Sequence, residues 1–344
     1  MSEQHVVLKT IAEKCGVSIM TVSRALDPRH NRKMRASTRE LILDTVKKYG
    51  YTSNLSARRL KRQKAESITL IMHDRLSRNM LSPDFDSHHE YISFSIMKGA
   101  LKAAREYNYD IKFELPPFHE SFQIKPAQTD GILFCTLWNM EHVIRELKKQ
   151  DIPYLAIKNN IQDPDDSPGI MYVSMNRTPG VIDSFKHLYS KGHRKIGFIG
   201  TSRQISSEAN RKLLRNFLLD KNIYDENLFY NVADYFDLRK LIASFNKRLP
   251  FTALVCFNDT SADLTVREFR EKGLRVPQDT AVVGFDGNIT YQGKGKTNLS
   301  TVAVPWEETA AEAVRTLIQK IENKDEAINF IKVLTTKFIQ GETT

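Results

Sequence analysis

Three runs of residues near the start of the chain place apolar side chains at the spacing of a helix. Their apolar positions are Leu8, Ile11, Ala12 and Cys15, then Val22, Ala25 and Leu26, then Leu41, Ile42, Val46 and Tyr49. Gly16 permits a tight turn between the first two helices, and Ser18 is suited to cap the second. Ser37 and Glu40 have capping-box spacing, so the third helix is expected to start at Ser37. The pattern predicts a small head of three helices, the first two with helix-turn-helix spacing.

After residue 66 the pattern changes to short apolar runs that alternate with helical segments. The expected strands are 67–73, 131–137, 153–158, 195–200, 252–257 and 282–286. The expected helices are 90–107, 140–150, 178–191, 207–221, 259–272 and 307–323. Strand and helix in alternation predict parallel sheets with right-handed crossovers, and the length of this segment predicts two such sheets. The fold class is therefore α/β, with an all-α head preceding a two-lobed body.

Composition limits the classes of protein that remain. With 344 residues the chain exceeds the roughly 250–300 residues that one core supports. No apolar run approaches the ~20 residues of a membrane span, and the polar start at Met1 lacks the apolar stretch of a signal peptide. We therefore expect a cytoplasmic protein that contacts no membrane. Cys15, Cys135 and Cys256 are odd in number and far apart, so they are expected to be buried free thiols.

The positive charge of the chain is concentrated in its first segment. Residues 1–64 hold fifteen Lys or Arg and five acidic residues, which makes this segment +10. The other 280 residues hold 36 basic and 36 acidic residues and are neutral. A basic segment that also has periodic apolar positions is expected to fold and to bind a polyanion, of which nucleic acid is the natural example.

The motifs of the head resemble those of the lactose-repressor (LacI) family of bacterial transcription regulators. The resemblance lies in VSIMTVSRAL, STRELI and YGYTSNLSARRL, in this order. It implies that the second helix enters the major groove of double-stranded DNA. Ile19, Met20 and Arg24 would then read base edges, and the residues expected at phosphates are Ser18, Thr21 and Ser23. The alternative is that Ile19 and Met20 belong to the core of the head.

The residues after the head resemble the hinge of the same family. In that family the hinge helix forms when two subunits meet over the minor groove, which implies a homodimer on a near-palindromic operator. Residues 54–60 are too few to hold a helix alone. Asn54 would cap this helix, Ala57 would lie in the groove, and Leu60 would be inserted at the central base step. The alternative is a plain linker in which Leu60 has no such role.

The body also resembles the LacI family, whose body is similar to a periplasmic sugar-binding protein with two lobes. The matching motifs are HLYSKGHRKIGFIG (187–200), FNDTSA (257–262), EKGLRVPQDTAVVGFDG (271–287) and NLSTVAVP (298–305). The implied division is a head at 1–52, a hinge and linker at 53–66 and a body at 67–344. Within the body, lobe 1 is expected at about 67–175 and 303–330, and lobe 2 at about 176–302 and 331–344. The resemblance is weak at 74–90 and 111–129.

The resemblance also implies a small-molecule effector, most often a carbohydrate, in the cleft between the lobes. Asn258 and Asp286 each follow a predicted strand, at the edge where open α/β sheets bind ligands. A carboxylate and a carboxamide can bind vicinal hydroxyls. The other candidates are Asn176, Trp306, and either Asn210 or Arg211 in the place of a family arginine. The alternatives are a strand-end turn for Asp286 and a buried aromatic for Trp306.

These observations favour a DNA-binding transcription regulator, of the kind that most often acts as a repressor, over two alternatives. A transport binding protein would have a signal peptide and no basic head. A sugar-metabolising enzyme with a DNA-binding appendage would need catalytic groups in the cleft, and no GxxxxGK, GxGxxG, HExxH or GxSxG motif is present. His88, His89 and Glu90 are expected to be solvated on a polar loop, so neither a metal nor a cofactor is expected. A regulator whose pocket has lost its ligand remains open.

Overall fold

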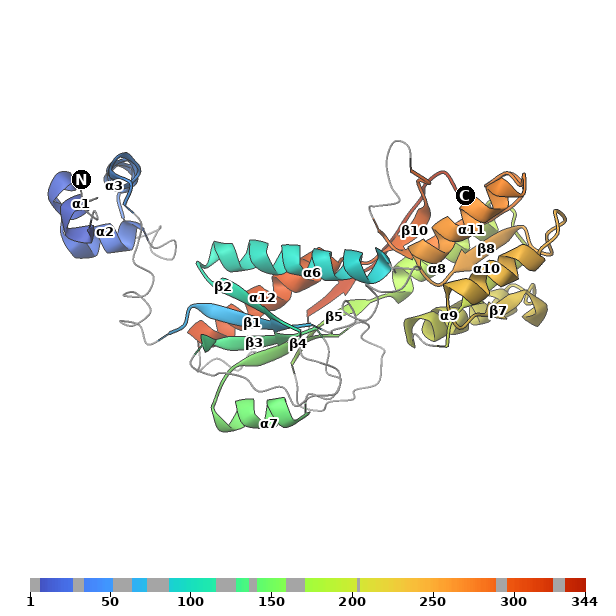
Figure 1. Cartoon of the computed structure of the whole chain (residues 1–344), viewed down its shortest axis with the longest axis horizontal. Coiled ribbons are helices and arrows are strands. Elements are labelled where there is room, and N and C mark those ends of the chain that lie inside the picture. Colours follow the sequence, from blue (N-terminus) through green and yellow to red (C-terminus); the bar gives the residue numbers. More distant parts are fainter. Residues whose placement is uncertain are drawn as a thin grey trace.

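The computed structural model describes ten stretches of the chain, which include three head helices and a body with two sheets (Figure 1). These stretches are residues 7–26, 34–51, 64–72, 87–115, 128–135, 141–158, 171–202, 205–288, 296–323 and 332–344. No described helix is long and apolar enough to cross a membrane.

The head consists of α1 (Leu8–Cys15), α2 (Ile19–Ala25) and α3 (Ala36–Tyr49). Its core contains Ile11, Ala12, Val22, Ala25 and Ile42, all buried. Gly16 has a φ of 64°, so the sharp turn between α1 and α2 uses the left-handed conformation that glycine adopts without strain. The helix-turn-helix prediction is therefore confirmed.

The predicted start of α3 is wrong by one residue. The helix begins at Ala36 with Arg35 as its N-cap, and no side chain caps it. The capping box expected from Ser37 and Glu40 is therefore absent, because Ser37 already lies inside the first turn. Gly50, with a φ of 60°, ends the helix as predicted.

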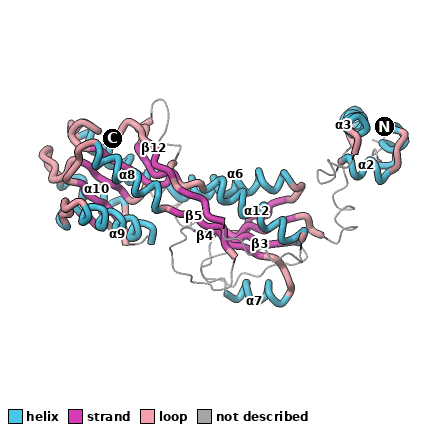
Figure 2. Tube along the Cα trace, turned by 180° about the vertical axis from the view of Figure 1, so that it is seen from behind, coloured by secondary structure: helices cyan, strands magenta, loops and turns pink. Residues whose placement is uncertain are grey.

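The first sheet of the body has six parallel strands in the order β11-β5-β4-β3-β1-β2. These strands are β1 (Ser67–Ile71), β2 (Asp110–Glu114), β3 (Gly131–Phe134), β4 (Tyr154–Lys158), β5 (Tyr172–Asn176) and β11 (Lys332–Thr335). The helices α6 (Ser87–Glu106) and α12 (Trp306–Glu322) cover one face, and α7 (Glu141–Lys149) covers the other (Figures 1 and 2). His88, His89 and Glu90 lie in α6 and not, as predicted, on a loop.

The second sheet has the strand order β12-β10-β9-β8-β6-β7, in which only the pairing of β12 with β10 is antiparallel. Its strands are β6 (Ile196–Gly200), β7 (Phe229–Asn231), β8 (Ala253–Cys256), β9 (Ala281–Asp286), β10 (Ser300–Ala303) and β12 (Lys337–Ile339). The helices α8 (Thr178–Ser190) and α9 (Ile205–Asp220) pack on one face, and α10 (Tyr235–Ser244) and α11 (Asp259–Glu271) pack on the other. The two predicted parallel sheets are present.

The chain passes between the sheets where β5 leads to α8, where β10 leads to α12, and where β11 leads to β12. The last crossing corrects the expected boundary, which placed 331–344 entirely in lobe 2. Residues 332–335 extend the first sheet beside β5, and only the strand that follows them joins the second sheet. Thr336 links the crossings, because its backbone N–H donates to the Asn176 carbonyl at 3.1 Å and its hydroxyl donates to the Arg177 carbonyl at 2.8 Å.

The three cysteines are free, but their burial differs from the prediction. Cys256 is buried, whereas Cys15 and Cys135 are only partly buried. Burial raises the pKa of the Cys256 thiol to about 12, so this side chain is a neutral part of the core.

Candidate DNA-binding and effector-binding sites

Helix α2 separates buried and exposed side chains cleanly. Val22 and Ala25 face the core of the head, while Ile19 and Met20 are 48% and 62% exposed. Arg24 is also exposed, one turn further along the same helix. The alternative that Ile19 and Met20 fill the core is therefore wrong, and α2 presents two apolar side chains and a guanidinium to its surroundings. Such a surface can contact thymine methyl groups and the acceptor atoms of guanine in a major groove.

The start of α2 is fixed by Ser18. Its Oγ accepts a hydrogen bond from the Thr21 N–H at 3.1 Å, and the two hydroxyls lie 2.8 Å apart. Ser18 and Ser23 are exposed and Thr21 is half-buried, so the hydroxyls lie beside the exposed surface of the helix. The other predicted DNA contacts, Asn54, Ala57 and Leu60, lie outside the described residues.

The carboxyl-terminal edge of the second sheet brings predicted effector residues to neighbouring strands. Asn258 follows β8 closely, Asp286 ends β9, and these strands pair in parallel. Asp286 is buried and has a φ of 110°, a backbone conformation that is rare for a residue with a side chain. Strained backbone of this kind occurs most often where function requires one geometry.

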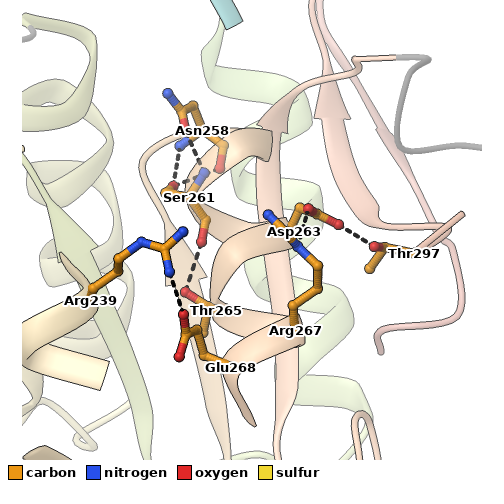
Figure 3. A network of polar contacts seen from close by, with 8 residues as sticks. All are labelled: Arg239, Asn258, Ser261, Asp263, Thr265, Arg267, Glu268 and Thr297. Carbon is orange, nitrogen blue, oxygen red and sulfur yellow. Dashed lines mark hydrogen bonds and ion pairs between the residues drawn. The ribbon is translucent and has the colours of Figure 1, made fainter. Parts of the chain in front are cut away.

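The side chain of Asn258 is engaged at both ends within the protein. Its Oδ1 accepts from the Ser261 N–H at 2.8 Å in a capping box at the start of α11 (Figure 3). Its Nδ2 donates to the Tyr235 hydroxyl at 2.9 Å. Asn258 therefore fixes α11 and orients Tyr235, which the sequence analysis did not single out. Tyr235 is the first residue of α10, a helix that was not among the expected ones.

Of the two candidates for the place of a family arginine, Asn210 is the one that faces inward. Asn210 is 4% exposed, and its Oδ1 has no hydrogen-bond partner among the described residues. Arg211 instead points to Glu226, with an Nη2 to Oε1 distance of 3.0 Å. Asn210 shares the inward face of α9 with Leu214, which is buried one turn later. An unpaired buried carbonyl oxygen can accept a hydrogen bond from a ligand hydroxyl.

The remaining candidates lie at the crossings between the sheets. Asn176 ends β5, and its Oδ1 accepts from the Thr178 N–H at 3.2 Å. Trp306 is buried at the start of α12. This agrees with the alternative expectation, in which Trp306 is a buried aromatic residue. Arg177, which the sequence analysis missed, is 3% exposed, with its guanidinium 5.0 Å from the Phe285 ring centroid and 5.9 Å from that of Trp306.

A cavity of about 710 Å³ lies against Trp306, between α6 and the last strands of both sheets. Tyr91, Phe94 and Lys98 line it from α6, and Gly287 lines it from the residues just after β9. The cavity therefore reaches side chains of the first lobe and the residue next to Asp286 in the second.

Comparisons with known proteins agree with this arrangement. The profile of the bacterial regulatory proteins of the lacI family matches residues 7–54, and that of periplasmic binding protein-like domains matches 185–344. Two similar relatives are the HTH-type transcriptional regulator RegA of Clostridium saccharobutylicum, 26% identical over 98% of both chains, and the probable HTH-type transcriptional repressor ExuR of Bacillus subtilis, 28% identical over 94% of this chain and 95% of its own. The chain carries a DNA-binding domain of the lacI family of bacterial regulatory proteins and a periplasmic binding protein-like domain.

Solved structures show that the chain shares its fold with transcription regulators over nearly their whole length. The CelR transcriptional regulator in complex with cellobiose is 20% identical with a TM-score of 0.63, over 98% of this chain and 100% of that one. The lac repressor dimer bound to operator and the anti-inducer ONPF is 19% identical with a TM-score of 0.64, over 99% of both chains. The predictions of a LacI-family fold and of a DNA-binding transcription regulator that is not an enzyme are confirmed.

Proposed function

We propose that this regulator binds a near-palindromic operator as a homodimer and represses transcription. We also propose that a carbohydrate bound between its lobes controls its affinity for DNA. The exposed surface of α2 carries the first part of the proposal. Arg24 lies on the side of α2 opposite the buried Val22 and Ala25, where a bidentate contact with guanine is sterically open. Ile19 and Met20 extend this surface toward the start of the helix.

The charge of the head supports the same role. The fifteen basic residues of the head and hinge segment 1–64 attract the phosphate backbone, and the neutral remainder of the chain adds no such attraction. A homodimer and the use of Asn54, Ala57 and Leu60 at the minor groove remain part of the proposal. The relatives support it, because one neighbouring structure is a repressor dimer on its operator.

The effector half of the proposal rests on polar groups at the strand ends. Asp286 supplies a buried carboxylate at the end of β9 and Asn210 a buried carbonyl oxygen on α9, while Tyr235 contacts Asn258 and Trp306 lines the cavity. Sugars bind through hydroxyl hydrogen bonds and by stacking on aromatic rings, so this set of side chains suits a carbohydrate. Neighbouring structures of the same fold hold cellobiose and ribose, and another relative is named a sucrose operon repressor.

Asn210 favours one competing function, a regulator that no longer binds a ligand. An asparagine in the place of a family arginine removes a charged donor from the pocket. Arg177 supplies a buried guanidinium near Trp306, which favours a working pocket of altered chemistry over an inactive one.

The test has two arms on the full chain. Selection from random duplex DNA is expected to enrich a near-palindrome with a flexible pyrimidine–purine step at its centre. A thermal-shift panel of cellobiose, ribose and sucrose is expected to show a higher melting temperature with at least one sugar. An asymmetric or unenriched DNA pool would refute the DNA half, and three unchanged melting temperatures would favour the ligand-free regulator.

A further inference from the structure

Tyr91 connects the two lobes outside the three crossings of the chain. It lies on α6, which packs on α12 and on the first sheet. Its hydroxyl donates a hydrogen bond to the backbone carbonyl of Gly287 at 2.9 Å, and Gly287 directly follows β9 of the second sheet. A bond between packed elements of different lobes must stretch or break when the lobes move relative to one another.

The first-lobe side of this contact is held firmly. A Cβ at Gly99 of α6 would lie 2.0 Å from the carbonyl oxygen of Glu307, so α6 and the start of α12 are in close backbone contact. Lys98 and Glu307 also form an ion pair at 2.8 Å between these helices. Tyr91 therefore extends from a pair of helices that moves as one unit.

The second-lobe side is a sharply defined corner made of Asp286, Gly287 and Asn288. Asp286 and Gly287 have φ values of 110° and 71°, and a Cβ at Gly287 would lie 2.7 Å from the Cα of Ala303. The Gly287 N–H donates to the Thr301 hydroxyl at 3.2 Å. The Asn288 N–H donates to Asp259 Oδ2 at 2.6 Å. These bonds hold the N–H groups of the corner within the second lobe, while the Gly287 carbonyl faces the first.

We propose that Tyr91 is a positioning residue that ties the Asp286–Gly287 corner to α6, so that a displacement of this corner by effector is passed to the first lobe. The inference rests on the proposed function, because it takes Asp286 as an effector ligand. A ligand shifts a conformational equilibrium only by contacts that differ between the two states, and this bond is such a contact. Burial raises the pKa of Tyr91, which keeps its hydroxyl protonated and able to donate.

Tyr91→Phe tests the inference because it removes the hydroxyl and keeps the ring. Tyr109→Phe is the matched control: its hydroxyl donates to Glu322 Oε1 at 2.8 Å, between elements that both pack on the first sheet. Loss of one neutral hydrogen bond shifts an opening equilibrium by about fivefold. Hydrogen–deuterium exchange of the full chain without ligand is therefore expected to be about fivefold faster at the Gly287 and Asn288 amides in Tyr91→Phe. Tyr109→Phe should leave these two rates unchanged.

The Val283 amide, inside the second sheet, distinguishes a local from a global effect. Unchanged exchange at the corner in Tyr91→Phe would overturn the inference, as would an equal increase in Tyr109→Phe or at Val283.

A second measurement uses the selected DNA and whichever of cellobiose, ribose or sucrose raises the melting temperature. Tyr91→Phe should reduce the factor by which that sugar changes DNA affinity, and an unchanged factor would also overturn it. A wild-type chain that selects no DNA would refute the proposed function, while the exchange comparison would still decide the role of Tyr91.

Discussion

Arg24→Ala separates recognition of a DNA sequence from general attraction to DNA. Arg24 is exposed on α2 and forms no ion pair with any residue that the structure describes. Its replacement should change the unfolding free energy of the head by less than about 0.5 kcal/mol. A bidentate contact with guanine contributes about 1–3 kcal/mol of discrimination, so the affinity for the selected DNA should fall by about 5- to 150-fold for each half-site contacted.

Fluorescence anisotropy with the selected duplex and with random duplex measures the two affinities at one salt concentration. Lys9→Ala is the matched control, because it removes one exposed positive charge from α1 of the same head. Lys9→Ala should weaken binding to both duplexes by a similar factor, as loss of a phosphate contact does. If Arg24→Ala also weakens both equally, Arg24 is a phosphate contact and the assigned reading surface of α2 is wrong.

Three further predictions concern the body. Asp286→Ala should abolish the effect of sugar on DNA affinity and leave DNA binding by the ligand-free protein nearly unchanged; unchanged sugar affinity by calorimetry would remove Asp286 from the pocket. Gly284→Ala places a Cβ 2.2 Å from Asp259 Oδ1, so it should lower the unfolding free energy in urea by about 1–3 kcal/mol, and an unchanged midpoint would contradict the close contact. Burial and Lys191 lower the pKa of His187, so the unfolded chain binds a proton at higher pH than the folded protein; the melting temperature should fall as pH drops below about 6.5, and less steeply in His187→Gln.

The head and most of the central strands were predictable because local pattern and burial coincide there, although the central strands β5 and β10 were not among the expected ones. Gly16, Ser18 and the alternation of buried and exposed positions along α2 act within a few residues of one another. The helix expected at 307–323 is likewise present as α12, and its buried residues include Ala310, Val314 and Leu317. Where the contacts of a segment are made mostly within that segment, the periodicity of its apolar residues is sufficient to predict its structure.

The parts that were missed depend on contacts between distant segments. β2 and β11 are edge strands of the first sheet, with charged and half-exposed residues, so they lack the continuous apolar run of a central strand. Arg177 follows Asn176 without any motif, and its burial depends on Phe285 and Trp306 more than a hundred positions later. The side-chain oxygen of Asn258 caps α11, and its side-chain N–H group donates to the Tyr235 hydroxyl. No local spacing in the sequence indicates this partner.

The central claim is that a sugar in the body controls DNA binding by the head. Its most direct test is titration of the full chain into labelled selected duplex, with and without a saturating concentration of the sugar that stabilises the protein. Because binding free energies are coupled reciprocally, the DNA affinity should change by about 5- to 150-fold, and saturating duplex should change the calorimetric affinity for the sugar by the same factor. Equal DNA affinities with and without a sugar that demonstrably binds would contradict the claim.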